Sequence, residues 1–457
     1  MQKREKFSSR LGFILISAGC AIGLGNVYRF PIITGAYGGA AFVLVYLLFL
    51  ILLGVPIITV ELAVGRGSQR SIATSFNVLQ KPGQKWGWMR YVGIVGNYLL
   101  MMFYTVITSW IFIYFYKYAT GSIMAVEATP DALGGVFGGM ISNPVLLILV
   151  TALVILVGFG VCSLGLEKGV ERITKFMMVA LFFLMIALAI YCCTLSGAAE
   201  GLKFYLIPSF TNMKEAGIGT VISAAMGQAF FTLSIGIGSV AIFGSYIGKD
   251  RSLLGESFTI AGLDTFVAIT SGLIVFPACF TFNGGVTADA GTVGAGFLFT
   301  TLSSIFNSMP AGRLIGALFF LFMIFASMST VIAVFENIIS FWMELTKLSR
   351  RKIALINIIL VFVLSLPCLF SLNIWGEFTI FGLGIMDLED KTVSNLLLPL
   401  GSLIYVLFCT TRYGWGWDKY FAEVNSGKGL KVAKWMKPYM SYILPLIIIA
   451  VLVMSVF

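Results

Sequence analysis

Long apolar runs separated by short polar loops constrain this chain more than any other feature of its sequence. A helix that crosses a bilayer needs about 20 mostly apolar residues, and eleven segments meet that requirement. They lie near residues 11–36, 40–65, 90–118, 144–163, 173–195, 217–247, 258–284, 313–345, 352–371, 391–411 and 439–457. The composition agrees, because 59% of the residues are hydrophobic and 11% are charged, against about 25% charged in soluble domains. The sequence therefore predicts an all-α integral membrane protein with eleven transmembrane helices.

The basic residues predict how these helices are oriented. Of the 30 Lys and Arg residues, 24 fall on the inner side and 5 on the outer side if the N-terminus is cytoplasmic, and cytoplasmic loops carry an excess of these residues. We therefore expect a multi-pass protein of the cell (plasma) membrane, with its N-terminus in the cytoplasm and its C-terminus outside. The same pattern accounts for the net charge of +10 without nucleic acid as a partner.

Several functional classes lack the residues they need. The chain has no histidine, and its seven cysteines are scattered without a CxxC spacing, so neither a cysteine metal site nor a disulfide framework is indicated. No nucleophile motif appears, which argues against an enzyme. No TVGYG-like filter or ring of acids appears, which argues against a channel.

Two spans contain glycine clusters that break the helical pattern. The first reads GCAIGLGN from Gly19 to Asn26, and the second reads TLSIGIG from Thr232 to Gly238. Each glycine weakens a helix by about 1 kcal/mol relative to alanine, and backbone freed inside a membrane is tolerated only around a cavity or within protein. Close helix packing through small residues is the simpler alternative for one cluster.

The two clusters lie five spans apart, in spans 1 and 6. Two five-helix halves with a broken helix in each predict a 5+5 inverted repeat with a transport site at the midplane. The predicted parts are a cytoplasmic segment, a first repeat, an extracellular loop, a second repeat, a cytoplasmic loop and one extra helix. Their bounds are 1–10, 11–195, 196–216, 217–411, 412–438 and 439–457.

Oxygen atoms predominate among the polar groups near the first break. Unwinding near Gly19–Gly25 frees backbone carbonyls, and Asn26 adds a neutral oxygen. On span 8, Ala326, Ser329 and Thr330 share one helix face. Hard cations prefer such oxygen ligands. The alternative is that both hydroxyls bond back to their own helix, as Ser and Thr commonly do in membrane helices.

Three stretches carry a resemblance to a known family. GLGNVYRFP (Gly23 to Pro31), FFTLSIGIG (Phe230 to Gly238) and ASMSTVIAV (Ala326 to Val334) resemble helices 1, 6 and 8 of the neurotransmitter:sodium symporters. An eleven-span layout is similar to the bacterial amino-acid transporters of that family, which have the leucine-transporter-type fold. The resemblance implies sodium-coupled import of a neutral hydrophobic or aromatic amino acid by alternating access. A proton-coupled amino-acid transporter of the same fold and a non-transporting amino-acid sensor remain alternatives.

The resemblance also implies two sodium sites and no chloride. One site uses the carbonyls of Gly19, Ile22 and Ala326 with the hydroxyls of Ser329 and Thr330, and the other uses the Ala21 carbonyl, Asn26, Thr232 and Asp264. An acid within a membrane is a functional candidate by default, although Asp264 could instead be a helix-end acid near the inner surface. Asp264 would supply the fixed negative charge that chloride provides in animal members.

The expected substrate pocket lies between the two breaks. Half-helix N-termini suit a substrate carboxylate, and the absence of a side chain at Gly23 leaves that carboxylate room. The resemblance assigns to this pocket Ala21, Gly23, Gly25, Leu100, Tyr104, Phe231, Thr232, Ser234, Ile237, Thr330 and Val334. The pocket walls carry no charge, so a substrate with a neutral hydrophobic side chain is expected.

The resemblance finally implies gates on both sides of the pocket. The outer gate would pair Arg29 with Asp390, together with Tyr104 and Phe231. The inner gate would pair Arg4 with Glu344. Two further membrane acids, Glu61 and Glu336, are expected to belong to structural networks. An amino-acid substrate and the lipid bilayer are the expected partners, and the sequence indicates no oligomeric state.

Overall fold

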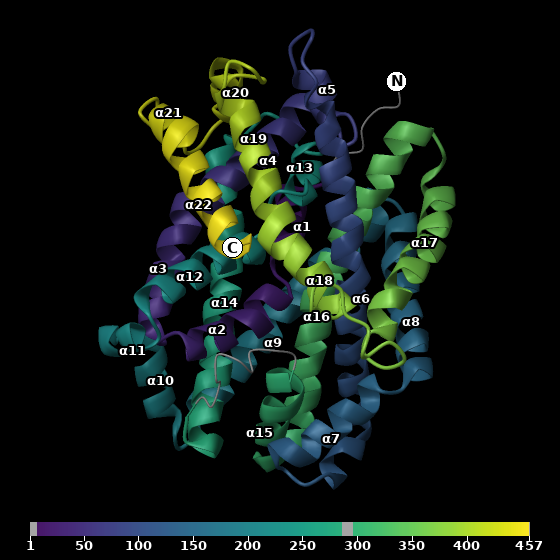
Figure 1. The fold of residues 1–457 in the computed structure, drawn as a ribbon, viewed down its shortest axis with the longest axis vertical. Coiled ribbons are helices and arrows are strands. Elements are labelled where there is room, and N and C mark those ends of the chain that lie inside the picture. The colour runs from purple at the N-terminus through teal and green to yellow at the C-terminus, as the bar shows by residue number, and fades with distance from the viewer. Residues whose placement is uncertain (1–6, 286–295, 457) are drawn as a thin grey trace.

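The computed structural model describes residues 7–285 and 296–456, and in this part of the chain the regular structure is helical apart from two isolated bridges. The predicted all-α class is therefore confirmed. Many of the helices run along the long axis of the molecule (Figure 1). Short helices gather at its two ends, with α5 (Ser75–Leu79) and α20 (Trp417–Val424) at one end and α7 (Pro130–Ile141) and α15 (Leu302–Ser308) at the other.

The first five predicted spans form helices with several π-helical turns. Their elements are α1 (Arg10–Ala21), η1 (Gly25–Arg29), α2 (Phe30–Ala36), α3 (Ala40–Phe49), η2 (Leu50–Gly54), α4 (Val55–Ser68), α6 (Met89–Thr120), α8 (Pro144–Ser163), η5 (Leu166–Glu171) and α9 (Arg172–Cys193). Two short helices, α10 (Ala198–Leu206) and α11 (Phe210–Glu215), follow at the α7 end.

The remaining spans follow in the same manner. Their elements are α12 (Ile218–Thr232), α13 (Ser239–Gly244), α14 (Leu253–Asn283), α16 (Gly312–Thr346), α17 (Arg350–Phe370), α18 (Ile385–Lys391), η7 (Thr392–Leu397), α19 (Leu398–Thr410), α21 (Met436–Pro438), η8 (Tyr439–Ile443) and α22 (Leu444–Val456).

The helix lengths support most of the predicted spans. Within the described residues, nine helical segments are long and apolar enough to cross a membrane. The pair Arg10–Ala21 and Gly25–Ala36 adds a tenth, bent by 56° at its break. The sixth predicted span consists of α12 and α13, which have 15 and 6 residues. Because neither piece is long enough alone, the count of eleven and the inverted repeat stay predictions.

Burial follows the pattern of a membrane protein rather than that of a soluble one. Large apolar side chains face outward, such as Phe183 at 75% and Ile359 at 67% exposure. Polar side chains including Asn26, Glu61 and Asp264 are completely buried. Such an apolar exterior needs an apolar solvent. The most apolar stretch of α16 is 83% buried, against 39% for those of α8 and α17, so α16 lies inside the bundle.

Candidate functional site

The first glycine cluster interrupts the chain between α1 and η1. The helix α1 ends at Ala21, and Ile22 takes an extended backbone conformation with ψ of 103°. Two amides released by this break find side-chain partners: Gly23 N donates to Asn26 Oδ1 at 3.1 Å, and Leu24 N donates to Tyr104 Oη at 3.2 Å. The break at the first cluster is therefore real, and side chains from inside the bundle support it.

The second cluster interrupts the chain between α12 and α13. Ser234, Gly236 and Gly238 all have positive φ, at 50°, 101° and 80°. A side chain at Gly236 would also collide with the Leu398 carbonyl, 2.1 Å from an added Cβ, so glycine is required there for two reasons. The Gly236 amide donates to the Glu61 carboxylate. Glu61 therefore acts as a structural acceptor at the break.

Carbonyl and hydroxyl oxygens from α1 and α16 meet beside the first break. The Thr330 hydroxyl lies 3.3, 3.4 and 3.2 Å from the carbonyl oxygens of Gly19, Cys20 and Ile22. Ser329 Oγ lies 2.8 Å from the Ala326 carbonyl of its own helix and 3.5 Å from the Ile22 carbonyl. The back-bond considered from the sequence is thus present at Ser329, whereas Thr330 reaches across to the broken helix.

This cluster is a good fit for a hard cation. A threonine hydroxyl has one proton, so it can donate to one of its three carbonyl neighbours at a time. The other two carbonyls then receive no hydrogen bond from Thr330. Burying a carbonyl without a partner costs free energy, so another partner is favoured there. Sodium accepts oxygen ligands of this kind, as other hard cations do. Gly19, Ile22, Ala326, Ser329 and Thr330 could supply the oxygen ligands of such an ion.

A second polar cluster surrounds Asp264. This residue lies well inside α14 and is fully buried, so the helix-end alternative does not apply. Asn26 Nδ2 donates to Asp264 Oδ1 at 2.7 Å, and the Thr232 hydroxyl lies 3.1 Å from Asp264 Oδ2. Ala21, whose carbonyl was expected in this cluster, is the last residue of α1. The Asn26 oxygen accepts a bond from Gly23 N, so the oxygens that meet in this cluster are the Asp264 carboxylate and the Thr232 hydroxyl.

A small cavity of about 20 Å³ lies between the two breaks. Its lining residues are Ala21, Gly23, Leu24, Gly25, Leu100, Tyr104, Phe231, Ser234, Thr330 and Leu398. Thr232, Ile237 and Val334 were expected there but do not line it. Leu24 and Leu398 were not expected. Leu24 belongs to the quoted GLGN motif and was therefore recognisable, whereas nothing in the sequence places Leu398 of α19 beside span 1.

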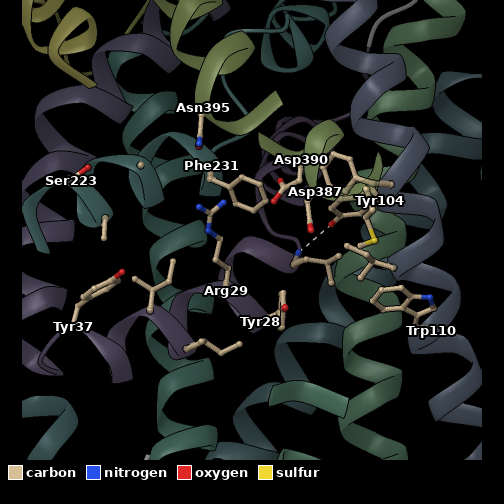
Figure 2. Close-up of a pocket in the computed structure, with 18 of the residues that line it drawn as sticks. Tyr28, Arg29, Tyr37, Tyr104, Trp110, Ser223, Phe231, Asp387, Asp390 and Asn395 are labelled. Carbon is tan, nitrogen blue, oxygen red and sulfur yellow. Dashed lines mark hydrogen bonds between the residues drawn. The ribbon is translucent and has the colours of Figure 1, made fainter. Parts of the chain in front are cut away.

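A much larger cavity of about 970 Å³ adjoins the small one, and its lining includes Phe137 and Ile141 of α7. Leu24, Tyr104 and Phe231 line both cavities, so these three residues separate them. Figure 2 shows Arg29, Phe231, Asp387, Asp390 and Tyr104 around this space. The large cavity is a vestibule that leads to the small one.

The expected outer gate residues face this vestibule without closing it. The Arg29 guanidinium lies 4.4 Å from the centre of the Phe231 ring, which is a cation–π contact. Asp390 Oδ1 instead accepts a hydrogen bond from Ser394 at 2.8 Å. Among the described residues no ion pair joins Arg29 to Asp390. The Arg29–Asp390 pair stays a prediction for a closed state.

The expected inner gate is described on one side only, because Arg4 lies outside the described residues. Glu344 accepts hydrogen bonds from Ser71 N and Thr74 Oγ1, both at 2.7 Å. Glu336 forms an ion pair with Arg350 at 2.6 Å and accepts a bond from the Tyr246 hydroxyl. Glu336 therefore has the structural role expected of it.

Sequence reasoning missed one support of the second break. Asn97 of α6 donates to the Ile237 carbonyl at 3.0 Å and accepts a bond from Asn337 at 3.1 Å. Both asparagines are almost fully buried. A polar amide in the middle of an apolar span was the available signal, because membrane helices rarely bury such groups without a purpose.

Comparison with known proteins agrees with this geometry. The sequence model described as "Sodium:neurotransmitter symporter family" matches residues 4–127 and 138–457. An uncharacterized sodium-dependent transporter of Bacillus subtilis is 32% identical over 452 residues, covering 98% of this chain and 97% of that protein. The human sodium- and chloride-dependent taurine transporter is 24% identical, covering 99% and 78%.

A solved structure is similar over the whole chain. It is the crystal structure of MhsT in complex with L-phenylalanine, which is 38% identical, with a TM-score of 0.87 and full coverage of both chains.

Proposed function

Because this chain belongs to the sodium:neurotransmitter symporter family, we propose that it imports a neutral hydrophobic or aromatic amino acid together with sodium. The family is one of sodium-dependent transporters and not of enzymes. The proposal adds to this the substrate class, two sodium ions and independence from chloride.

One observation carries the sodium part of the proposal. The Thr330 hydroxyl of α16 faces three carbonyls at the end of the broken α1. An all-oxygen cluster without histidine favours a hard cation over a proton relay. A bound cation would also tie α1 to α16, so that its arrival or loss would change the relative position of these two helices. Such differential stabilisation of conformations is what coupling requires.

The shape of the small cavity supports an α-amino acid as the second solute. A Cβ at Gly23 would lie 2.5 Å from the Tyr104 hydroxyl and 2.7 Å from the Thr330 hydroxyl, so this position admits no side chain. A substrate carboxylate could approach the freed amides and the Tyr104 hydroxyl there. Leu100 and Phe231 offer apolar walls to its side chain. Burying a charged side chain against them would cost several kcal/mol.

The volume of the small cavity implies that substrate binding moves its walls. About 20 Å³ is close to the space needed by one water molecule. A phenylalanine-sized ligand would need Phe231 and Tyr104 to shift toward the vestibule, which has ample room. We propose that closure over the ligand then brings Arg29 to Asp390. MhsT was solved with L-phenylalanine, which supports testing aromatic amino acids first.

Asp264 supports the absence of a chloride requirement. Its carboxylate lies against Asn26 and Thr232 and brings a fixed negative charge to the proposed second sodium site. A cation buried there would already have its counter-charge, since a buried ion is stable only when paired. Ala268, one turn along α14, has no hydroxyl to hold an anion.

A binding assay followed by an uptake assay tests the proposal. The melting temperature of the purified protein should rise with Phe, Tyr, Trp or Leu in sodium, and should rise less in potassium. Proteoliposomes with an inward sodium gradient should then accumulate the best ligand. Accumulation that is equal under a proton gradient without sodium would favour the proton-coupled alternative. Binding without any accumulation would favour the sensor, and displacement by glycine or glutamate better than by leucine would defeat the substrate class.

A further inference from the structure

One buried acid holds the beginning of α1 against α9. Glu171, the last residue of η5, accepts hydrogen bonds from Ser8 N at 2.9 Å, Ser8 Oγ at 2.6 Å and Ser9 Oγ at 3.1 Å. Glu171 is only 3% exposed. Hydrogen bonds to a carboxylate are shorter and stronger than those between neutral groups. The three bonds therefore form a firm contact between segments more than 160 residues apart.

Gly12 provides the space that this carboxylate occupies. A Cβ at Gly12 would lie 2.0 Å from Glu171 Oε1 and 2.5 Å from its Cδ, so any side chain would displace the carboxylate. Ser9 is the N-cap of α1, and its hydroxyl also accepts a bond from Gly12 N at 3.0 Å. The negative charge of Glu171 thus lies at the N-terminus of a twelve-residue helix, where the helix dipole stabilises it.

The other end of the same helix supplies the oxygens of the proposed sodium site. Gly19, in the last turn of α1, packs against Thr174 and Met178 of α9; an added Cβ would lie 3.3 and 3.2 Å from them. Glu171 of η5 and the Thr174–Met178 stretch of α9 therefore contact both ends of α1. A displacement of its start moves its last carbonyls as well, because a hydrogen-bonded helix of three turns moves largely as one body.

An ion pair at the start of α1 is a weaker restraint than the Glu171 contact. Arg10 pairs with Glu256 of α14 at 3.0 Å, but its side chain is 50% exposed. Exposed ion pairs contribute little. Glu171 is consequently the main polar restraint on this end of the helix.

We infer that Glu171 is a positioning residue for sodium: by holding Ser8, Ser9 and the Gly12 face of α1, it keeps the carbonyls of Gly19 and Ile22 opposite Thr330. Release of this contact lets α1 leave α9 and opens the sodium site on the side away from the vestibule. The inference rests on the proposed sodium-coupled function. The inference adds one step to that function: the contact between Glu171 and the start of α1 must break when sodium is released.

Two variants break this contact in different ways. Glu171→Gln removes the charge, and Gly12→Ala displaces the carboxylate while improving the intrinsic helix propensity of α1. Glu167→Gln is the matched control, because Glu167 lies in the same π-helical segment η5 and is exposed. Uptake is measured in proteoliposomes against sodium concentration, and hydrogen exchange of residues 8–21 is followed by mass spectrometry.

Both variants should raise the sodium concentration for half-maximal uptake by about tenfold. The maximal rate at saturating sodium should stay within about twofold of wild type, because sodium restores the position of α1. Exchange of the α1 amides should be faster in potassium and return toward wild type in sodium. The double variant should resemble either single variant, since both remove one contact.

Two results would overturn the inference. The first is a sodium titration that is unchanged from Glu167→Gln and wild type in both variants. The second is a lower maximal rate with no change in the sodium titration, which indicates a purely structural role. A wild-type protein without any sodium dependence would instead contradict the proposed function itself, so the two failures are distinguishable.

Discussion

Replacing Thr330 by valine tests the proposed sodium site at its central residue. Valine has nearly the shape of threonine but carries no hydroxyl, so the packing of α16 should change little. The substitution removes one oxygen that lies 3.2–3.4 Å from three carbonyls of the broken helix. Leaving buried polar groups without their partner costs about 1–3 kcal/mol. Because 1.4 kcal/mol corresponds to a factor of ten, the sodium concentration for half-maximal uptake should rise about 5- to 150-fold.

Ser327→Ala is the matched control for this substitution. Ser327 lies on the same helix and is completely buried, and its hydroxyl donates to the Ile324 carbonyl of its own helix at 3.2 Å. Its loss should leave the sodium titration unchanged. Thr330→Ser, which keeps the hydroxyl, should stay close to wild type. All four proteins are compared in proteoliposomes, with uptake of the preferred amino acid measured from zero to saturating external sodium.

The outcome of this comparison decides whether sodium binds at Thr330. A sodium titration of Thr330→Val that matches wild type would refute the argument. Sodium would then bind either without the Thr330 hydroxyl or away from these three carbonyls. An equal shift in Ser327→Ala would also refute it, because the effect would then belong to α16 as a whole.

Three further predictions follow from the site. Asp264→Asn should abolish uptake or make it respond to chloride, whereas wild-type uptake should not change when gluconate replaces chloride; a wild-type loss of half would contradict the charge argument. Gly23→Ala should weaken amino-acid binding by at least about tenfold, because even a methyl group meets Tyr104 and Thr330 at 2.5 and 2.7 Å; unchanged affinity in the thermal-shift assay would mean that the ligand binds elsewhere. Ile237 does not line the small cavity in this structure, but the cavity must expand around a ligand, so Ile237→Phe should shift competition toward smaller amino acids; an unchanged order of competitors would exclude Ile237 from the expanded pocket.

The substrate residues show how far a motif can predict a pocket. Gly23, Gly25 and Thr330 line the small cavity as expected, and the two glycines leave space there that a side chain would fill. Ile237 and Val334 lie in the expected motifs but do not line this cavity. Their side chains point according to the helix packing around them, with Ile237 against Gly96, and a motif does not specify that packing.

The gates show a different limit. Arg29 and Asp390 were predicted as a pair, and both line the vestibule in the structure. The distance between two charged groups on separate helices depends on which conformation the transporter adopts. A sequence contains the groups for every state, whereas one structure holds a single arrangement of them.

The all-helical membrane architecture and the two helix breaks could be predicted from the sequence alone. Apolar run length and glycine clustering are local properties, and the bilayer requires that each local stretch satisfy its own backbone. Other distant groups meet only because of helix packing, such as Leu398 beside the small cavity and Glu171 with Ser8. Segments that are 163 to 374 residues apart, as Ser8 and Glu171 or Leu24 and Leu398 are, come together only through helix packing. That packing depends on the shapes of all the helices at once, and no single stretch of sequence contains it.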